Sequence, residues 1–311
     1  MQDNWEREAL NQLLQAGIKE QRRSRRWGIF FKLLGFGYLF VVLALVMGWI
    51  GQRTSEDVNR GPHTALVNMD GVIAVGGEAD IGVIAQGLRD AFEDSRTRGV
   101  ILRVNSPGGS PVQSGQLHDE ILRLRKENPK IPLYVVVEDI CASGCYYTAV
   151  AADKIYADKA SIVGSIGVLM DSFGFTGAME KLGVERRLLT AGENKGFLDP
   201  FSPMNEAQRA KAQEMLGEIH QQFINVVKTG RGKRLANDPD LFSGLVWSGE
   251  RSVKLGLIDG LGSVDSVARD VIKAEDVVDF TPQPDYLDRL AKRVGVAAAS
   301  SLGARLEAQL R

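Results

Sequence analysis

The chain has 311 residues, of which 44% are hydrophobic and 25% are charged, as in folded proteins and unlike disordered ones. At about 150 residues per domain, this length accommodates about two domains. The formal net charge is −1, so no overall basic excess exists for binding nucleic acid through its phosphates, and we expect no nucleic-acid partner. The charge is unevenly distributed, because residues 1–50 carry +3 and the rest of the chain −4.

A membrane-spanning helix is predicted over residues 27–50. Its last 18 residues, Leu33 to Ile50, include no charge, and a helix needs about 20 apolar residues to cross a hydrocarbon core. Four arginines, at 22, 23, 25 and 26, precede this segment. The positive-inside rule therefore predicts that residues 1–26 are cytoplasmic and that the rest of the chain is exported. We expect a single-pass membrane protein with its main domain on the far side of the membrane from the cytoplasm.

Two other interpretations of the apolar segment fit less well. A cleaved signal peptide is disfavoured because the charged leader is long and no small-x-small site follows Ile50. A buried core helix is disfavoured because soluble helices rarely lack a polar face. Residues 51–63 are polar, with Gly and Pro, and are predicted to form a linker.

The globular region is predicted to span residues 64–280, and residues 281–311 to form an amphipathic C-terminal extension. Apolar residues at helical spacing predict helices around 84–92, 117–124 and 216–227. Runs of β-branched and apolar residues predict strands at 64–69, 72–75, 100–105, 131–137, 154–158 and 184–190. The first two strands flank Asp70-Gly71, a hairpin signal. Strands that alternate with helices predict an α/β fold with a largely parallel sheet.

Two glycine-containing loops each follow a strongly apolar strand. The first is Asn105–Ser110 (NSPGGS), and the second is Cys141–Tyr147 (CASGCYY). Functional groups in α/β folds tend to lie beyond the carboxyl ends of strands, and glycine lets backbone N–H groups approach a ligand. Two such turns could direct two N–H groups at one oxyanion, although a plain tight turn is an equal alternative for the first loop.

Ser143 lies between a strand and a helix start. This place suits a nucleophile on a sharp turn, but it equally suits a helix N-cap. A serine nucleophile needs a base, and the three histidines, His63, His118 and His220, lie in the linker or within helices, without local support for a Ser–His–Asp site.

A neutral lysine can replace histidine as the base. Lys195 is the best candidate, because it lies in a loop after the predicted strand 184–190, with Phe197 and Phe201 nearby. Taken alone, it is most simply interpreted as a surface lysine. Ser165, in the glycine-flanked segment 164–168 (GSIGV), is either a turn residue or a hydroxyl that orients the lysine.

The two cysteines of the chain, Cys141 and Cys145, flank Ser143. An exported domain is in an oxidising compartment, so a disulfide is conceivable, but four-residue spacing across a strand-to-helix turn leaves its geometry open. Metal binding would need further ligands, and a cysteine nucleophile has no paired base. We expect no metal and no cofactor.

Together these motifs resemble the signal peptide peptidase A family in its short form, membrane-anchored bacterial serine proteases with a Ser–Lys dyad. The resemblance covers roughly residues 64–265, and the order and spacing of its segments make it specific. The matching segments are 105–109 (NSPGG), 142–147 (ASGCYY), 152–157 (ADKIYA), 164–168 (GSIGV), 191–195 (AGENK), 242–250 (FSGLVWSGE) and 256–262 (GLIDGLG). One departure is Cys145, where the family usually has Gly.

The resemblance implies a crotonase/Clp-protease-like fold built of ββα units. It implies that Ser143 is the nucleophile and Lys195 the general base, with Ser165 orienting the lysine amine. The backbone N–H groups of Gly109 and Gly144 would form the oxyanion hole. It further implies a ring-like homo-oligomer in which the serine and the lysine of one site come either from one chain or from neighbouring subunits. It also implies an inner-membrane location with the catalytic domain in the periplasm. Its substrates would be remnant signal peptides or other apolar, extended peptides at the membrane.

Two other function classes stay open on the sequence. A crotonase-type acyl-CoA enzyme shares the paired N–H donors and needs no Ser–Lys pair, although an exported domain would not meet cytosolic CoA. A catalytically silent membrane scaffold of the same fold is the other alternative.

Overall fold

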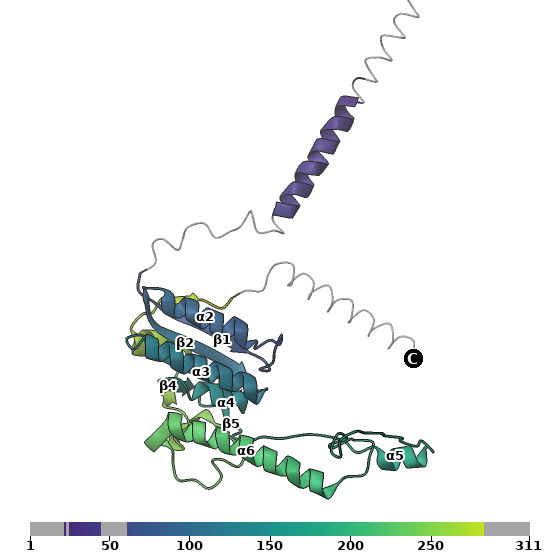
Figure 1. The fold of residues 1–311 in the computed structure, drawn as a ribbon. Helices are drawn as coiled ribbons and strands as arrows, with labels where there is room; N and C mark the ends of the chain where they lie inside the picture. The colour runs from purple at the N-terminus through teal and green to yellow at the C-terminus, as the bar shows by residue number, and fades with distance from the viewer. Residues whose placement is uncertain (1–21, 23–24, 45–60, 283–311) are drawn as a thin grey trace, which may run out of the picture. The chain divides into compact units, whose positions relative to one another are not determined.

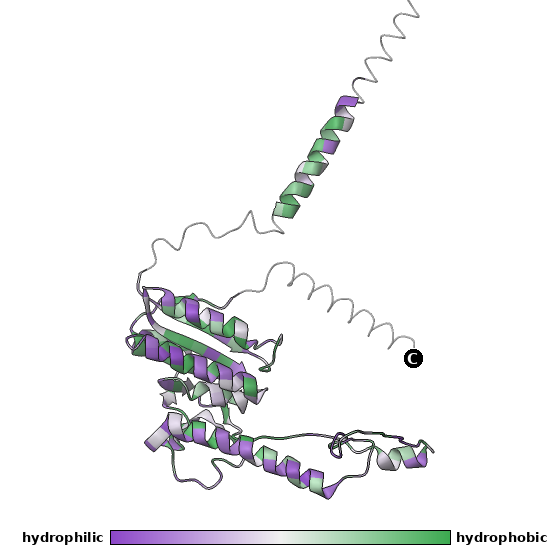
Figure 2. Ribbon diagram, viewed as in Figure 1, coloured by the Kyte–Doolittle hydropathy of each residue, from purple (hydrophilic) through white to green (hydrophobic). Residues whose placement is uncertain are grey.

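The structure is a computed structural model that describes residues 22, 25–44 and 61–282. In the N-terminal region, one helix, Arg25–Ala44, is long and apolar enough to cross a membrane. Its 20 residues span about 30 Å, the thickness of a hydrocarbon core, and Figure 2 shows its mostly apolar surface. The remainder of the predicted span, the predicted segment 1–26 apart from a few arginines, most of the linker and nearly all of the C-terminal extension lie outside the described residues.

Residues 61–282 belong to one compact unit, Arg60–Pro282, built around a mixed eight-stranded sheet (Figure 1). The strand order is β6-β5-β3-β2-β1-β8, and β4 pairs with β3 and β7. All pairs are parallel except β5 with β6. The strands are β1 His63–Asp70, β2 Thr97–Ser106, β3 Leu133–Ala142, β4 Lys154–Ala157, β5 Ile162–Gly164, β6 Val246–Ser248, β7 Gly260–Leu261 and β8 Val277–Asp279. The predicted α/β class with a largely parallel sheet is confirmed.

Three predicted helices are confirmed, and each begins at a residue whose side chain caps it. Asp80 caps α2 (Ile81–Glu93), Ser110 caps α3 (Pro111–Glu127), and Asn205 caps α6 (Glu206–Arg231). The shorter helical segments are α4 Gly144–Ala149, α5 Thr176–Lys181, η2 Gly232–Arg234, α7 Gly249–Lys254, α8 Val264–Ser266 and η3 Val267–Ile272.

One face of the sheet is fully buried, and the other is covered over part of its length. The larger core joins one face to α2, α3, α4 and the C-terminal half of α6, and includes Met69, Leu102 and Val135. The smaller core on the other face includes Ile101 and Val136. The first halves of β2 and β3 therefore consist mainly of apolar residues, and the glycine loops begin at the carboxyl ends of these strands.

Three local predictions are wrong. Residues 72–75 form no strand: Ile73 makes only isolated parallel bridges, and no hairpin forms because both edges of β1 are taken by β2 and β8. Residues 184–190 form no strand, since they are exposed and no described strand pairs with them. His63 is not a linker residue but the buried first residue of β1.

A buried ion pair fastens the 256–262 segment to the domain. Asp259 accepts hydrogen bonds from the guanidinium of Arg231 (2.7 Å) and the N–H of Ile155 (2.8 Å), and the Arg231 side chain is 1% exposed. Burial by itself raises the pKa of Asp259, but these bonds outweigh it and bring the pKa below its ordinary value. Tyr146 of α4 donates to the Leu257 carbonyl (2.7 Å), so the same segment also supports the helix that follows Ser143.

Candidate active site

Ser143 lies on a sharp turn between β3 and α4, with φ 53° and ψ −123°. A non-glycine residue in such a conformation costs about 1–3 kcal/mol and persists only where its surroundings hold it. Its N–H donates to the Gly164 carbonyl (2.8 Å), and its own carbonyl accepts from Tyr147 N–H (3.0 Å). Its side chain makes no capping bond to α4. The sequence allowed Ser143 to be either a nucleophile or a helix N-cap. The capping hydrogen bond is absent, so the hydroxyl is free to act as a nucleophile.

The two glycine loops meet at this turn. A β-carbon on Gly108 would lie 2.7 Å from Gly144 N and 2.9 Å from Ser143 Cβ, so only glycine lets the loops approach this closely. The segment 105–110 is held by Ile73, whose N–H donates to Gly108 O (2.9 Å) and whose carbonyl accepts from Ser110 N–H (2.9 Å).

The backbone N–H groups of Gly109 and Gly144 are both available to a ligand. In the parallel bridge with Ile73, the bonds engage Gly108 and Ser110, which leaves the N–H of Gly109 directed away from that partner. Gly144 is the first residue of α4, and the N–H groups of a first helical turn have no partner within the helix. A β-carbon on Gly144 would lie 3.2 Å from Gly109 N, so the two donors are close neighbours.

Ser165 lies on a second strained turn, with φ 53°, directly after β5. Its N–H donates to the Leu245 carbonyl (2.8 Å), and its carbonyl accepts from Gly167 N–H (2.9 Å). His220 of α6 contacts the next carbonyl, that of Ile166, through Nε2 (3.1 Å). The sequence did not predict this contact, which attaches the Ser165 turn to the long helix.

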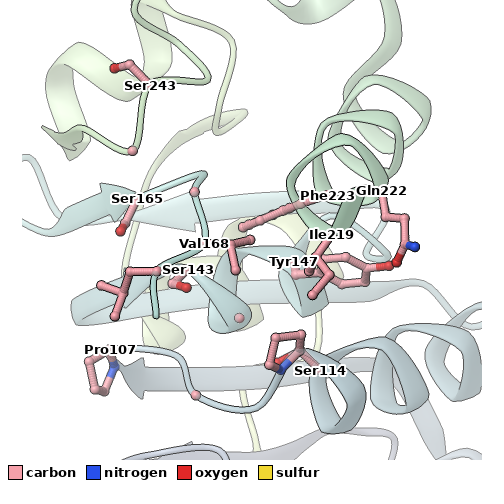
Figure 3. Close-up of a pocket in the computed structure, with 16 residues that line it drawn as sticks. Pro107, Ser114, Ser143, Tyr147, Ser165, Val168, Ile219, Gln222, Phe223 and Ser243 are labelled. Carbon is pink, nitrogen blue, oxygen red and sulfur yellow. The ribbon is translucent and has the colours of Figure 1, made fainter. Parts of the chain in front are cut away.

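These turns open into a cavity of about 520 Å³ (Figure 3). The predicted residues Ser143, Ser165, Gly109 and Gly144 all line it, so the fold brings four of the five predicted site residues together. The wall also includes Ser114, Tyr147, Val168, Leu169, Ile219, Gln222 and Phe223. The i, i+3, i+4 spacing of the last three on α6 is the sequence signal that could have identified them.

Lys195, the fifth predicted residue, does not line this cavity. It is exposed and belongs to residues 169–205, which we call the arm; Figure 1 shows this segment leaving the sheet after β5, passing α5 and returning through α6. Gln208 of α6 contacts Asn194 (3.4 Å) and the N–H of Leu198 (3.2 Å). Gln208 precedes the cavity residue Ile219 by 11 positions, about 16 Å along the helix.

The cysteines beside Ser143 form a disulfide, Cys141–Cys145, with a Cα–Cα distance of 5.2 Å, and both residues are fully buried. Within the described part of the chain, no group of three or more His, Cys, Asp or Glu side chains is placed to hold a metal ion.

The chain is similar to known proteins across most of its length. The profile of peptidase family S49 matches residues 125–278. A protein of Brucella abortus named Na(+)/H(+) antiporter NhaA is 42% identical over 256 residues, which are 79% of this chain and 34% of that protein. Because the chain spans about a third of that protein's length, the antiporter name carries no conclusion here. Among solved structures, a mutant of the 1510-N membrane-bound stomatin-specific protease with a substrate peptide covers 76% of this chain and 99% of its own, at 12% identity and a TM-score of 0.46.

Two peptidases match the same region. A protein of Haemophilus influenzae named protease 4 is 33% identical over 228 residues, covering 72% of this chain and 36% of that protein. A protein of Enterococcus faecium named signal peptide peptidase SppA is 30% identical over 241 residues, covering 75% of this chain and 69% of that protein. The family match and this last relative, together with the α/β fold, lead to one conclusion: the chain belongs to peptidase family S49.

Proposed function

We propose that this protein is a membrane-anchored serine endopeptidase in which Ser143 attacks the peptide carbonyl. One observation carries the proposal: the hydroxyl of Ser143 is released from helix capping on a strained turn, beside the free N–H groups of Gly109 and Gly144. A carbonyl bound above Ser143 would place its developing oxyanion between these two donors, which stabilises the transition state for acyl transfer. Water would then hydrolyse the acyl-enzyme.

The general base in this proposal is Lys195 of a neighbouring subunit. Within one chain the base is distant, because its loop is attached about 16 Å along α6 from the nearest helix residue of the cavity wall. Ser165 borders the same cavity as Ser143, so its hydroxyl would accept a hydrogen bond from an incoming lysine amine. Closure of the cavity by the neighbour would remove water from the amine and favour its neutral, basic form.

The arm supports assembly of this kind. Its apolar side chains are unusually exposed, with Leu169, Phe173, Leu182 and Leu189 each more than 70% accessible. Large exposed apolar side chains that gather on one segment are typical of interaction surfaces. The arm nevertheless has internal structure: Phe175 N–H donates to Pro200 O (2.8 Å), and the rings of Phe175 and Phe201 stack at 5.3 Å. A structured apolar arm that carries the base fits a second copy of this chain.

The substrates in this proposal are apolar, extended peptides, such as the signal peptides that remain in the membrane after protein export. The cavity wall opposite Ser143 is largely apolar, with Val168, Leu169, Ile219 and Phe223. The arginines before the anchor helix favour a cytoplasmic N-terminus and a periplasmic catalytic domain. A reporter fused after Arg311 that is active only in the cytoplasm would contradict this orientation.

The decisive experiment uses the full-length protein in detergent with a fluorogenic signal-peptide substrate. Ser143→Ala and Lys195→Ala should each lower kcat by at least ~10³-fold. Co-expression of the two variants should restore part of the activity, since a Lys195→Ala subunit supplies Ser143 and its Ser143→Ala neighbour supplies the lysine. A dyad within one chain would give no recovery. Parent-like cleavage by both variants would refute the dyad, and tight CoA-thioester binding without cleavage would favour an acyl-CoA enzyme.

A further inference from the structure

The disulfide Cys141–Cys145 spans the proposed nucleophile, and each end of it is attached to a different part of the fold. Cys141 is in the centre of the sheet, paired with Ser106 of β2 on one side and Val163 of β5 on the other. Cys145 is the second residue of α4. The bond therefore joins the carboxyl end of β3, which is paired on both sides, to the first turn of the helix, and it encloses Ala142, Ser143 and Gly144.

The helix that follows this turn lacks the usual means of fixing its start. α4 has six residues, too few to be stable alone, and its N-cap side chain makes no capping bond. A serine at this position normally anchors the first turn through its hydroxyl. Here that hydroxyl is needed for attack on the substrate, so another group must hold the first turn of α4 against β3.

We infer that the Cys141–Cys145 disulfide replaces the missing N-cap and is a positioning element for catalysis, which keeps the Ser143 hydroxyl and the Gly144 N–H aligned. This inference rests on the proposed function. The direction of the Gly144 N–H depends on ψ of Ser143, and the strained values at Ser143 persist only if both flanking residues are held. Pairing with β2 and β5 restrains Cys141, and the disulfide extends that restraint to Cys145.

The same bond is permanent rather than switchable in the folded enzyme. Both cysteines are fully buried, within the core cluster that also contains Tyr146 and Val163. Exchange with an external thiol requires contact with a disulfide sulfur, so a reductant gains access only when this part of the core opens.

The test compares the double variant Cys141→Ala/Cys145→Ala with Leu88→Ala in the full-length protein. Leu88 is a fully buried core residue on α2, outside the cavity wall, so its variant loses stability without disturbing the turn. Below the unfolding temperature of each protein, the double variant should lose about tenfold or more in kcat and in the rate of labelling by a fluorophosphonate. Its KM should stay within about twofold, whereas Leu88→Ala should keep the parent kcat.

Hydrogen–deuterium exchange of the peptide that contains residues 141–147 gives a readout independent of catalysis. Exchange there should accelerate in the double variant and not in Leu88→Ala; parent-like exchange, or a parent-like kcat, would overturn the inference. If the parent neither cleaves nor labels, the proposed function fails, and exchange alone decides whether the bond braces the turn. Treatment of the folded parent with a reducing phosphine and then iodoacetamide should leave both cysteines unalkylated; rapid alkylation with parallel loss of activity would show a switch instead.

Discussion

Gly108→Ala tests the geometry of the proposed oxyanion hole at its tightest point. Gly108 has φ +99°, and the added β-carbon would lie 2.7 Å from both Ala142 O and Gly144 N, and 2.9 Å from Ser143 Cβ. Two of these are backbone atoms and the third is the β-carbon of the proposed nucleophile. None of them can move by a side-chain rotation, so one of the two loops must shift. Misalignment of a single oxyanion donor costs about 10²–10³-fold in kcat, or roughly 3–4 kcal/mol of transition-state stabilisation.

The matched control is Gly76→Ala. Gly76 also has a positive φ (+68°), but its β-carbon would meet no atom within 4 Å among the described residues. Both variants therefore carry the backbone strain, and only one disturbs the site. We expect the loss of kcat for Gly108→Ala alone, measured by peptide cleavage. Thermal unfolding should show a loss of stability for both variants, larger for Gly108→Ala because its β-carbon also clashes with backbone atoms. A folded Gly108→Ala enzyme with kcat within about threefold of the parent would refute the proposed oxyanion hole.

Three further outcomes are expected. Asp259→Asn should lower the free energy of unfolding at pH 7 by on the order of 3 kcal/mol, because Arg231 is left buried without its counter-charge. The pKa of Asp259 is lowered in the folded protein, so this stabilisation is fully present above the ordinary pKa of 3.8 and is lost as the pH falls below it. Urea unfolding curves of parent and variant should therefore converge in acid. Tyr146→Phe leaves the Leu257 carbonyl unpaired and should cost about 1–3 kcal/mol in the same assay. Leu189→Glu, at a side chain 95% exposed, should leave the thermal unfolding of an isolated subunit unchanged but reduce oligomer mass in sedimentation, and an unchanged mass would contradict the interface assigned to the arm.

Local sequence patterns predicted the central sheet well because the first halves of its central strands are largely buried. The apolar runs at 100–105 and 131–137 correspond to β2 and β3, and the loops after them carry the glycines of the site. The patterns failed where pairing partners mattered. Asp70-Gly71 has the chemistry of a hairpin turn, yet the edges of β1 are occupied by strands from distant parts of the chain. Residues 184–190 have strand composition but no strand beside them.

The sequence alone identified the apolar N-terminal helix, the α/β class and four residues that line one cavity, because charge, periodicity and turn glycines are local properties. The tertiary structure decided what depends on distant contacts. It placed Ser143 at a positive φ, with a hydroxyl that makes no capping hydrogen bond to α4. It brought the loop of Gly109 against Gly144 and formed the disulfide whose geometry the sequence spacing left open. It also placed Lys195 on an exposed arm away from its own cavity, because α6 is a long rigid helix that separates the two. The uneven charge of the chain predicts its orientation in the membrane. The distance along α6 between the arm and the cavity is the reason that the proposed mechanism requires a second subunit.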